Sequence, residues 1–269
     1  MQNNQFNLKN VFGKSILLPT IILAIIILGI IFIPMFSSYD YMRPDFAHIL
    51  EAPSIQHLFG TDDLGRDLLV RTFVAGRVSF KIAIAASLMI MLIGVLYGAI
   101  SALSGGVIDM LMMRIVEVLY GIPFLFFSIL LLSLFGNSML LSFIAIASIS
   151  WLDIARIIRG QTLHLKQKEF IIAAYLMGLN NFQVIIKHII PNLLALILIY
   201  LALIIPNMII LSATLSFFGL GVIEPMTSWG LLIHDGAMNL TFWWLLFFPS
   251  LIMISTLLSF AFITNARRI

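Results

Sequence analysis

Six apolar stretches, each about 17 residues or longer, dominate this chain of 269 residues. A helix needs about 20 apolar residues to cross the roughly 30 Å hydrocarbon core of a bilayer. Little polar sequence is left for a separate soluble domain, and the stretches do not alternate in polarity as strands of a membrane barrel would. We therefore predict an all-α polytopic membrane protein with six transmembrane helices, at about 15–36, 80–103, 115–135, 138–156, 192–217 and 243–264.

The first stretch is expected to remain in the protein as an anchor. Its apolar run is longer than the roughly 7 to 15 residues of a secretory signal, and Pro34-Met35-Phe36 offers no small-residue cleavage site. We divide the chain into an N-terminal part, 1–77, which holds the anchor and the polar segment after it, and a five-helix part, 78–269.

The distribution of basic residues predicts the orientation, because Lys and Arg near span ends tend to stay in the cytoplasm. If both termini are cytoplasmic, ten of the fifteen Lys and Arg residues lie inside. The other five lie in or beside one long polar segment, where charge counts weigh less. The ten are Lys9, Lys14, Arg114, Arg156, Arg159, Lys166, Lys168, Lys187, Arg267 and Arg268.

The segment between the first two spans, about 37–77, carries a dense polar motif and is predicted to lie outside. Thr and Asp oxygens can cap free backbone amides, so a short helix is expected to follow the motif. An ordinary solvated loop is the alternative, because Asp and Gly are common in turns. The motif residues are Gly60, Thr61, Asp62, Asp63, Gly65, Arg66 and Asp67.

The connection between the second and third spans begins with Gly105-Gly106, which predicts a turn followed by a helix start. Asp109, Arg114 and Glu117 stand at near-helical spacing, so their charges could support one another. Charged side chains that reach toward a membrane surface would give the same pattern. Pro123 is expected to bend the third span.

The longest segment on the predicted cytoplasmic side, about 157–191, alternates polar turns with apolar pieces too short to span. We predict two short helices there. Ala173, Ala174 and Gly178 would give one helix a smooth face that another chain's backbone can approach, and the glycine can end the helix. A surface helix that binds only lipid is the alternative.

Glycines and aromatic residues between the last two spans predict a cap at the outer membrane surface, formed by Gly219, Gly221, Pro225 and Trp229. Phe242-Trp243-Trp244 then predicts an interfacial aromatic belt at the start of the last span.

Chemistry of several kinds is missing from the sequence. No G-x-x-x-x-G-K-[ST] loop is present, and there is no cysteine. The five histidines are dispersed and form no H-E-x-x-H or similar pair, so we predict no metal site and no catalytic residues. Ionisable residues deep within the spans are scarce, which argues against a proton-coupled carrier. The chain is not expected to be an enzyme.

The sequence from Glu169 through Ala174, followed by Gly178 and then 188–192, resembles the EAA motif of binding-protein-dependent ABC importer permeases. The chain is similar in particular to the C-type permease of the dipeptide, oligopeptide and nickel branch, and the resemblance covers nearly the whole chain. The sequence departs from the pattern at Ile172, Glu117 and Asn265. Further matches are 59–67, 77–79, Gly105-Gly106, Asp109, Met113-Arg114, Trp151, Ala155-Arg156, Arg159-Gly160, 216–221, Pro225 and Trp229-Gly230.

The resemblance implies the type I ABC importer permease fold, with a cytoplasmic coupling helix that fits a groove on an ATPase. In that arrangement Ala173, Ala174 and Gly178 permit close approach, Glu169 lies at the coupling helix, and Pro191 marks its exit into the fifth span. A B-type permease would complete a heterodimer, with two ATP-binding subunits inside and a solute-binding protein outside. ATP and Mg would bind those partners, and this chain would bind no cofactor and no nucleic acid.

The function implied is uptake of di- or oligopeptides through the cytoplasmic (inner) membrane of a bacterium, among membrane lipid. The same architecture importing nickel or a metal chelate is the alternative. A stand-alone carrier or channel would need its own energy source or a selectivity ring, and we find neither in the sequence. A membrane enzyme would need a nucleophile–base pair or a metal constellation.

Overall fold

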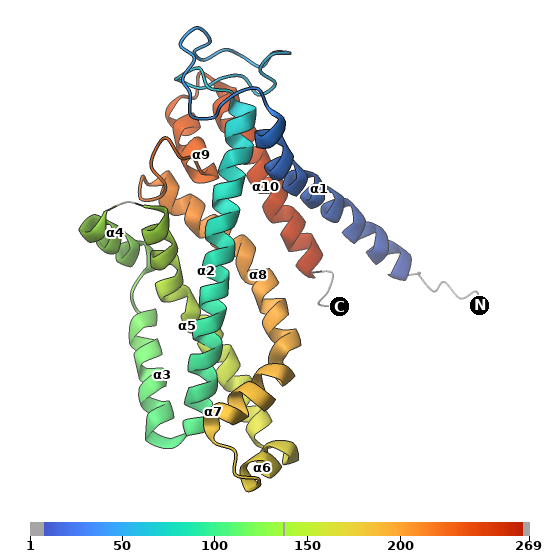
Figure 1. Cartoon of the computed structure of the whole chain (residues 1–269), viewed down its shortest axis with the longest axis vertical. Helices are drawn as coiled ribbons and strands as arrows, with labels where there is room; N and C mark the ends of the chain where they lie inside the picture. Colours follow the sequence, from blue (N-terminus) through green and yellow to red (C-terminus); the bar gives the residue numbers. More distant parts are fainter. Residues whose placement is uncertain (1–7, 137, 266–269) are drawn as a thin grey trace, which may run out of the picture. The chain divides into compact units, whose positions relative to one another are not determined.

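The computed structural model describes residues 8–136 and 138–265, and within them it is built from helices joined by turns (Figure 1). This confirms the predicted all-α class. A short π-helical segment, Ile185–Ile189, joins α7 to α8. The helices are α1 Leu8–Phe36, α2 Leu68–Ser104, α3 Gly106–Tyr120, α4 Phe124–Phe135, α5 Met139–Lys166, α6 Glu169–Leu176, α7 Asn181–Val184, α8 Ile190–Phe217, α9 Trp229–Met238 and α10 Trp243–Asn265.

Five helical stretches of the described chain are long and apolar enough to cross a membrane. They are Ile16–Phe36, Leu68–Ser104, Met139–Lys166, Asn181–Phe217 and Trp243–Thr264. The pair α3 and α4 adds a sixth candidate if the two are counted as one broken span. The predicted number of six therefore depends on that pair.

The third predicted span, 115–135, is not one helix. Helices α3 and α4 meet at an angle of 82°, with the break at Gly121 to Pro123. Pro123 adopts an extended backbone with ψ of 129° and precedes α4 directly, since proline has no N–H to continue the helix before it. The bend was expected at this residue, but a complete break was not.

The second predicted span is longer than its apolar run. Helix α2 begins at Leu68 rather than near residue 80, and its 37 residues make a rod of about 55 Å. The short helix expected after the polar motif is therefore the first part of α2. The predicted boundary between residues 77 and 78 lies inside this helix.

The chain divides into two compact units. Unit 1 contains the residues up to Lys81 and those from Ile209 onward, and unit 2 contains Ile82–Met208. Helix α10 packs on α1 and α9 in unit 1, and α5 packs on α3 and α4 in unit 2. This division differs from the predicted one at 77/78, because the last part of the chain folds with the first.

Two glycines bring α2 and α5 into direct backbone contact in unit 2. A methyl group at Gly94 would lie 2.7 Å from Ile154 Cβ, and one at Gly98 would overlap the carbonyl of Ala155. Gly94 and Gly98 form a G-x-x-x-G pair, whose spacing puts both on one helix face and allows close helix contact in membranes. The pair went unnoticed in the sequence, although its spacing is a readable signal.

Candidate functional site

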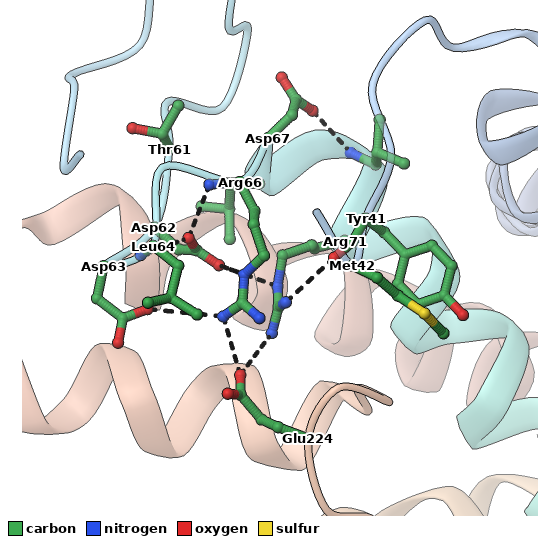
Figure 2. Close-up of polar contacts among 12 residues, drawn as sticks. Tyr41, Met42, Thr61, Asp62, Asp63, Leu64, Arg66, Asp67, Arg71 and Glu224 are labelled. Carbon is green, nitrogen blue, oxygen red and sulfur yellow. Dashed lines mark hydrogen bonds and ion pairs between the residues drawn. The ribbon is translucent and has the colours of Figure 1, made fainter. Parts of the chain in front are cut away.

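The site residues predicted from the sequence lie in and around two polar clusters, in one exposed loop, and between α8 and the start of α9. The first cluster lies in unit 1, where the 37–67 segment meets the turn before α9 (Figure 2). Arg66 Nε binds Asp62 Oδ2 at 2.8 Å, and Arg66 Nη2 binds Glu224 Oε1 at 2.9 Å. Arg71 Nη2 reaches the same Glu224 oxygen at 3.2 Å, and Arg71 Nε lies 3.1 Å from Asp62 Oδ2 without hydrogen-bond alignment. We call these four residues the arginine cluster.

Burial makes the arginine cluster energetically important. Asp62, Arg66 and Arg71 are all buried, Arg71 completely, while the side chain of Glu224 is 46% exposed. Burial raises the pKa of Glu224, but the two arginines outweigh it and hold this pKa below its ordinary value. The two positive and two negative charges balance. Asp63, 3.7 Å from Arg66 and 68% exposed, adds only a peripheral charge.

The polar motif itself builds the turn that presents Asp62. The carboxylate of Asp62 accepts the backbone N–H groups of Leu64 at 3.0 Å and Arg66 at 2.9 Å. Asp67 Oδ1 accepts the N–H of Val70 at 2.9 Å and so caps the start of α2. Gly65 has φ of 74° and passes against the backbone of Asp45, where a side chain would not fit. The capping prediction is confirmed for Asp67, and the alternative of a plain solvated loop is wrong.

Thr61 and Gly60 tie the motif to the rest of the 37–67 segment. Thr61 Oγ1 donates to the carbonyl of His48 and accepts the N–H of Glu51 at 2.8 Å. Gly60 has φ of 77°, and a methyl group there would lie 2.6 Å from the carbonyl oxygen of Glu51. The motif and residues 48–51 are thus parts of one hydrogen-bonded segment.

Trp229 in the predicted outer cap is fully buried. Its indole Nε1 donates to the carbonyl of Thr72 at 3.0 Å, and its ring fits against Gly76, where a methyl group would lie 2.8 Å from it. Trp244 is also buried and donates to the carbonyl of Thr61 at 3.2 Å. The rings of these two residues therefore pack inside the chain, whereas Trp243 is 55% exposed, as a belt residue would be.

The other cap residues shape the turn after α8. Gly219 has φ of 72°, and its N–H donates to Ser216 at 3.0 Å while that of Leu220 donates to Leu215 at 2.8 Å. These two bonds form a Schellman motif, which ends a helix with a left-handed residue. Gly221 lies against Ser216, where a side chain would overlap, and exposed Pro225 follows Glu224 through a cis peptide bond.

The second polar cluster lies in unit 2. Arg159 grips Asp109 with two hydrogen bonds of 2.6 Å, from Nε to Oδ1 and from Nη2 to Oδ2. Ser101 Oγ also donates to Asp109. Arg114 pairs instead with Glu117 at 2.8 Å on an exposed surface, so the predicted support between Asp109 and Arg114 is wrong. Across the two helices, the planar guanidinium of Arg159 matches both carboxylate oxygens of Asp109.

Two more basic residues of α5 join it to neighbouring helices of unit 2. The guanidinium carbon of Arg156 lies 4.3 Å from the centre of the Tyr120 ring, a cation–π contact. Lys166 Nζ donates to the carbonyls of Ala102 at 3.2 Å and Leu103 at 3.1 Å, which lack helical partners at the end of α2. Helices α2, α3 and α5 are therefore tied together where the loop to α6 begins.

The predicted loop 157–191 contains one separate short helix. Residues up to Lys166 belong to α5, and α6 is that helix, while α7 is one turn that continues into α8. The second short helix is thus not separate. Asn180 caps this turn through a reciprocal capping box with Gln183. Pro191 is the second residue of α8 and follows the end of the π segment after one intervening residue, where the helical bonding must adjust to its missing N–H.

Gly178 ends α6, as predicted. It has φ of 84°, and its N–H donates to Tyr175 at 2.9 Å while that of Leu179 donates to Ala174 at 3.2 Å. This is again a Schellman motif. A methyl group at Gly178 would touch nothing within 4 Å in this chain, so its conformation, and not crowding within the chain, requires glycine.

The exposed face of this loop is more apolar than the motif suggests. Ala174 is buried, whereas Glu169, Ala173 and Gly178 are exposed. Around them lie large apolar side chains: Phe170 40%, Ile172 51%, Leu176 84%, Met177 71% and Phe182 66% exposed. We call Ala173, Gly178 and these five residues the α6 face. Helix α6 lies at the same end of unit 2 as the α2–α3 turn (Figure 1).

Comparison with known proteins gives a consistent result. Residues 90–267 match the family described as "Binding-protein-dependent transport system inner membrane component". The chain is 48% identical to the oligopeptide transport system permease protein OppC of Haemophilus influenzae, over 95% of this chain and 83% of the relative. It is 41% identical to OppC of Bacillus subtilis, with 95% and 84% covered. It is 38% identical to the dipeptide transport system permease protein DppC of Bacillus subtilis, with 84% and 72% covered.

Proposed function

Because this chain belongs to the family of binding-protein-dependent transport system inner membrane components, as a multi-pass permease subunit in a bacterial inner membrane, we propose how it carries out peptide uptake. With a second permease of the B type it forms the path for di- and oligopeptides, and two ATPases that bind ATP and Mg drive the cycle. A solute-binding protein delivers the peptide. The names of the relatives favour peptides over nickel or a metal chelate.

The observation that carries the proposal is the α6 face. Seven residues of one short helix and its flanks are exposed together, five of them large and apolar. A soluble surface rarely leaves such a group uncovered, and exposed apolar patches mark interaction sites. Helix α6 spans only eight residues, too few to cross a membrane. We assign it as the coupling helix that enters a groove of the ATPase.

The chemistry of α6 fits that role. Glu169 stands in its first turn, where a negative charge is favourable near free N–H groups. Ala173 and Gly178 add little bulk at the exposed surface, so a partner's backbone can approach closely there. Ala174 instead packs inward and helps to fix the helix on its own chain.

Through α5, a movement of α6 would be transmitted to the membrane helices of unit 2. Helix α6 follows α5 after two residues, and α5 is fixed to α3 by the Arg159–Asp109 pair. Helix α5 also contacts α2 through Gly94 and Gly98. A push on α6 would therefore move these helices as a group and not one at a time.

The proposed docking sets the orientation. With α6 in the cytoplasm, the end of α2 at Ser104 is cytoplasmic as well, because Lys166 ties it to the end of α5. Helix α2 is long and apolar enough to cross the membrane once, so we place its other end, at Leu68, outside. The 37–67 segment then faces the solute-binding protein, and both termini lie in the cytoplasm.

Co-purification from membranes tests the docking. The tagged chain is extracted in mild detergent with its ATPases, and wild type is compared with Ala173→Arg, which adds bulk and charge on the α6 face without changing a glycine turn. We expect Ala173→Arg to lose most of the bound ATPase while retaining the partner permease. Gln161→Arg, at an exposed position on α5, is the matched control and should retain both. If Ala173→Arg still binds the ATPase fully, α6 is not the coupling helix.

A further inference from the structure

Two histidines and a glutamate converge in the 37–67 segment. Suitable ligand atoms of His48, Glu51 and His57 all lie within 4.8 Å of one another. His48 Nδ1 is 2.9 Å from Glu51 Oε1, and the rings of His48 and His57 are 5.6 Å apart between centres. This group was not predicted from the sequence. Eight residues separate the two histidines, whereas the metal-binding patterns considered there place the ligands within a few residues of one another.

His57 is held in the manner of a metal ligand. Its Nδ1 is 2.9 Å from Asp67 Oδ2, and both residues are buried. A carboxylate on one ring nitrogen fixes the tautomer and the orientation of an imidazole, and it raises the basicity of the other nitrogen. Asp67 is itself fixed, because its second oxygen caps α2 at Val70.

The backbone beside these residues is also unusual. Leu50, between His48 and Glu51, has φ of 53°, a left-handed conformation that residues other than glycine rarely adopt. Hydrogen bonds hold this turn: the N–H of Leu50 donates to Asp62 at 3.0 Å, and Thr61 Oγ1 donates to the carbonyl of His48. The strained turn places the side chains of His48 and Glu51 on the same side as His57.

The exposed parts of His48 and Glu51 give a hydrated ion access to this place. Their side chains are 39% and 41% exposed. A separate polar cavity of about 280 Å³ is lined by His57, Asp67, Tyr39 and Arg66 but not by His48 or Glu51. Water can therefore reach the site from the surface and complete a coordination shell.

We propose that His48, Glu51 and His57 bind one Zn²⁺ ion, with water in the fourth position. Two imidazoles and one carboxylate form a ligand set that zinc uses, whereas magnesium and calcium need mostly oxygen ligands. The carboxylate offsets part of the ion's charge, and Asp67 supports His57 from behind. The ion links the turn at 48–51 to residue 57 and so stiffens the 37–67 segment. This proposal does not depend on the ATPase docking or on the substrate.

Metal analysis of the purified, membrane-extracted permease complex tests the site. The complex is stripped with chelator, equilibrated with Zn²⁺ alone, exchanged into metal-free buffer and measured for zinc per chain. We expect about one retained zinc per wild-type copy of this chain. His48→Gln and Glu51→Gln, at half-exposed positions that should fold normally, are each expected to weaken binding at least about tenfold. His164→Gln, an exposed histidine in α5, is the control and should change nothing.

A second readout separates specific binding from loose association. Zn²⁺ should raise the unfolding temperature of wild type and of His164→Gln but not of His48→Gln, because an ion that binds only the folded state stabilises it. The proposal is overturned if wild type retains no zinc, or if His48→Gln and Glu51→Gln retain it as well as His164→Gln does. His57→Gln is not decisive, since it also removes the buried contact with Asp67.

Discussion

Arg159 of α5 binds Asp109 of α3, 50 residues earlier, through two hydrogen bonds that are each 2.6 Å long. The pair is partly buried, and Ser101 adds a third bond to the carboxylate. It is the strongest polar link between α3 and α5 that the described residues offer, and it stands where the loop to α6 leaves the bundle.

We expect Arg159→Lys to destabilise the protein by about 1 to 3 kcal/mol, because a lysine cannot reproduce the planar fork. Asp109→Asn should cost a similar amount. Thermal unfolding of the purified complex measures the change. Arg114→Lys is the matched control, since the Arg114–Glu117 pair is exposed and worth only about 0 to 1 kcal/mol. Equal effects at positions 159 and 114 would show that the buried pair has no special role.

Glu224→Gln is expected to destabilise unit 1 by about 1 to 2 kcal/mol, because water screens this half-exposed group. The substitution leaves Arg66 and Arg71 with Asp62 as their one buried counter-charge, beside the exposed Asp63. Hydrogen exchange of the 37–67 segment should increase. The control is Asp63→Asn, which removes a distant and exposed charge from the same cluster. If both variants behave like wild type, solvent and not Glu224 balances the arginines.

The stability of unit 1 should depend on pH through Asp235. Burial, and then repulsion by Glu224, raise its pKa from 3.8 to about 6. Between about pH 4 and pH 6 the folded chain therefore holds this proton more tightly than the unfolded chain, so stability falls as pH rises through that window. Allowing for partial exposure, we expect a loss of about 1 to 2 kcal/mol.

Asp235→Asn isolates this effect, since other carboxyl groups titrate in the same range. The difference in unfolding free energy between wild type and variant should change between pH 4 and pH 6 and be constant above about pH 7. A difference that stays constant from pH 4 to pH 7 would contradict the raised pKa.

Gly178 should tolerate asparagine better than alanine. Its φ of 84° is accessible to glycine and, at moderate cost, to asparagine, whereas alanine is strained by about 1 to 2 kcal/mol there. Nothing within 4 Å would obstruct a methyl group, so any loss reflects the backbone alone. Protease sensitivity of the α6 loop in the complex measures the loosening, with Gly160→Ala, in the regular helix α5, as the control. Equal sensitivity of the alanine and asparagine variants would argue against a conformational role.

Features that depend on neighbouring residues could be read directly from the sequence. The apolar runs predicted the all-α membrane class because the length of such a run is set by bilayer thickness. Gly178 predicted the end of α6, and Pro123 predicted a bend, since left-handed φ and a missing N–H act within one turn of helix. A Thr or Asp of the polar motif was predicted to cap a helix for the same reason, and Asp67 is the residue that does so.

Features that join distant residues were decided by the tertiary structure. Glu224 stood in an ordinary turn, yet it binds two arginines more than 150 positions earlier. Tryptophan is a residue type typical of membrane interfaces, yet the rings of Trp229 and Trp244 are buried. Their N–H groups donate to backbone carbonyls in the first half of the chain. His48 and His57 are brought together only by the turn that Thr61 and Asp62 hold. A local pattern specifies which conformations a segment can adopt, whereas the partner of a charge or a ring is set by which surfaces pack, and packing depends on the whole fold.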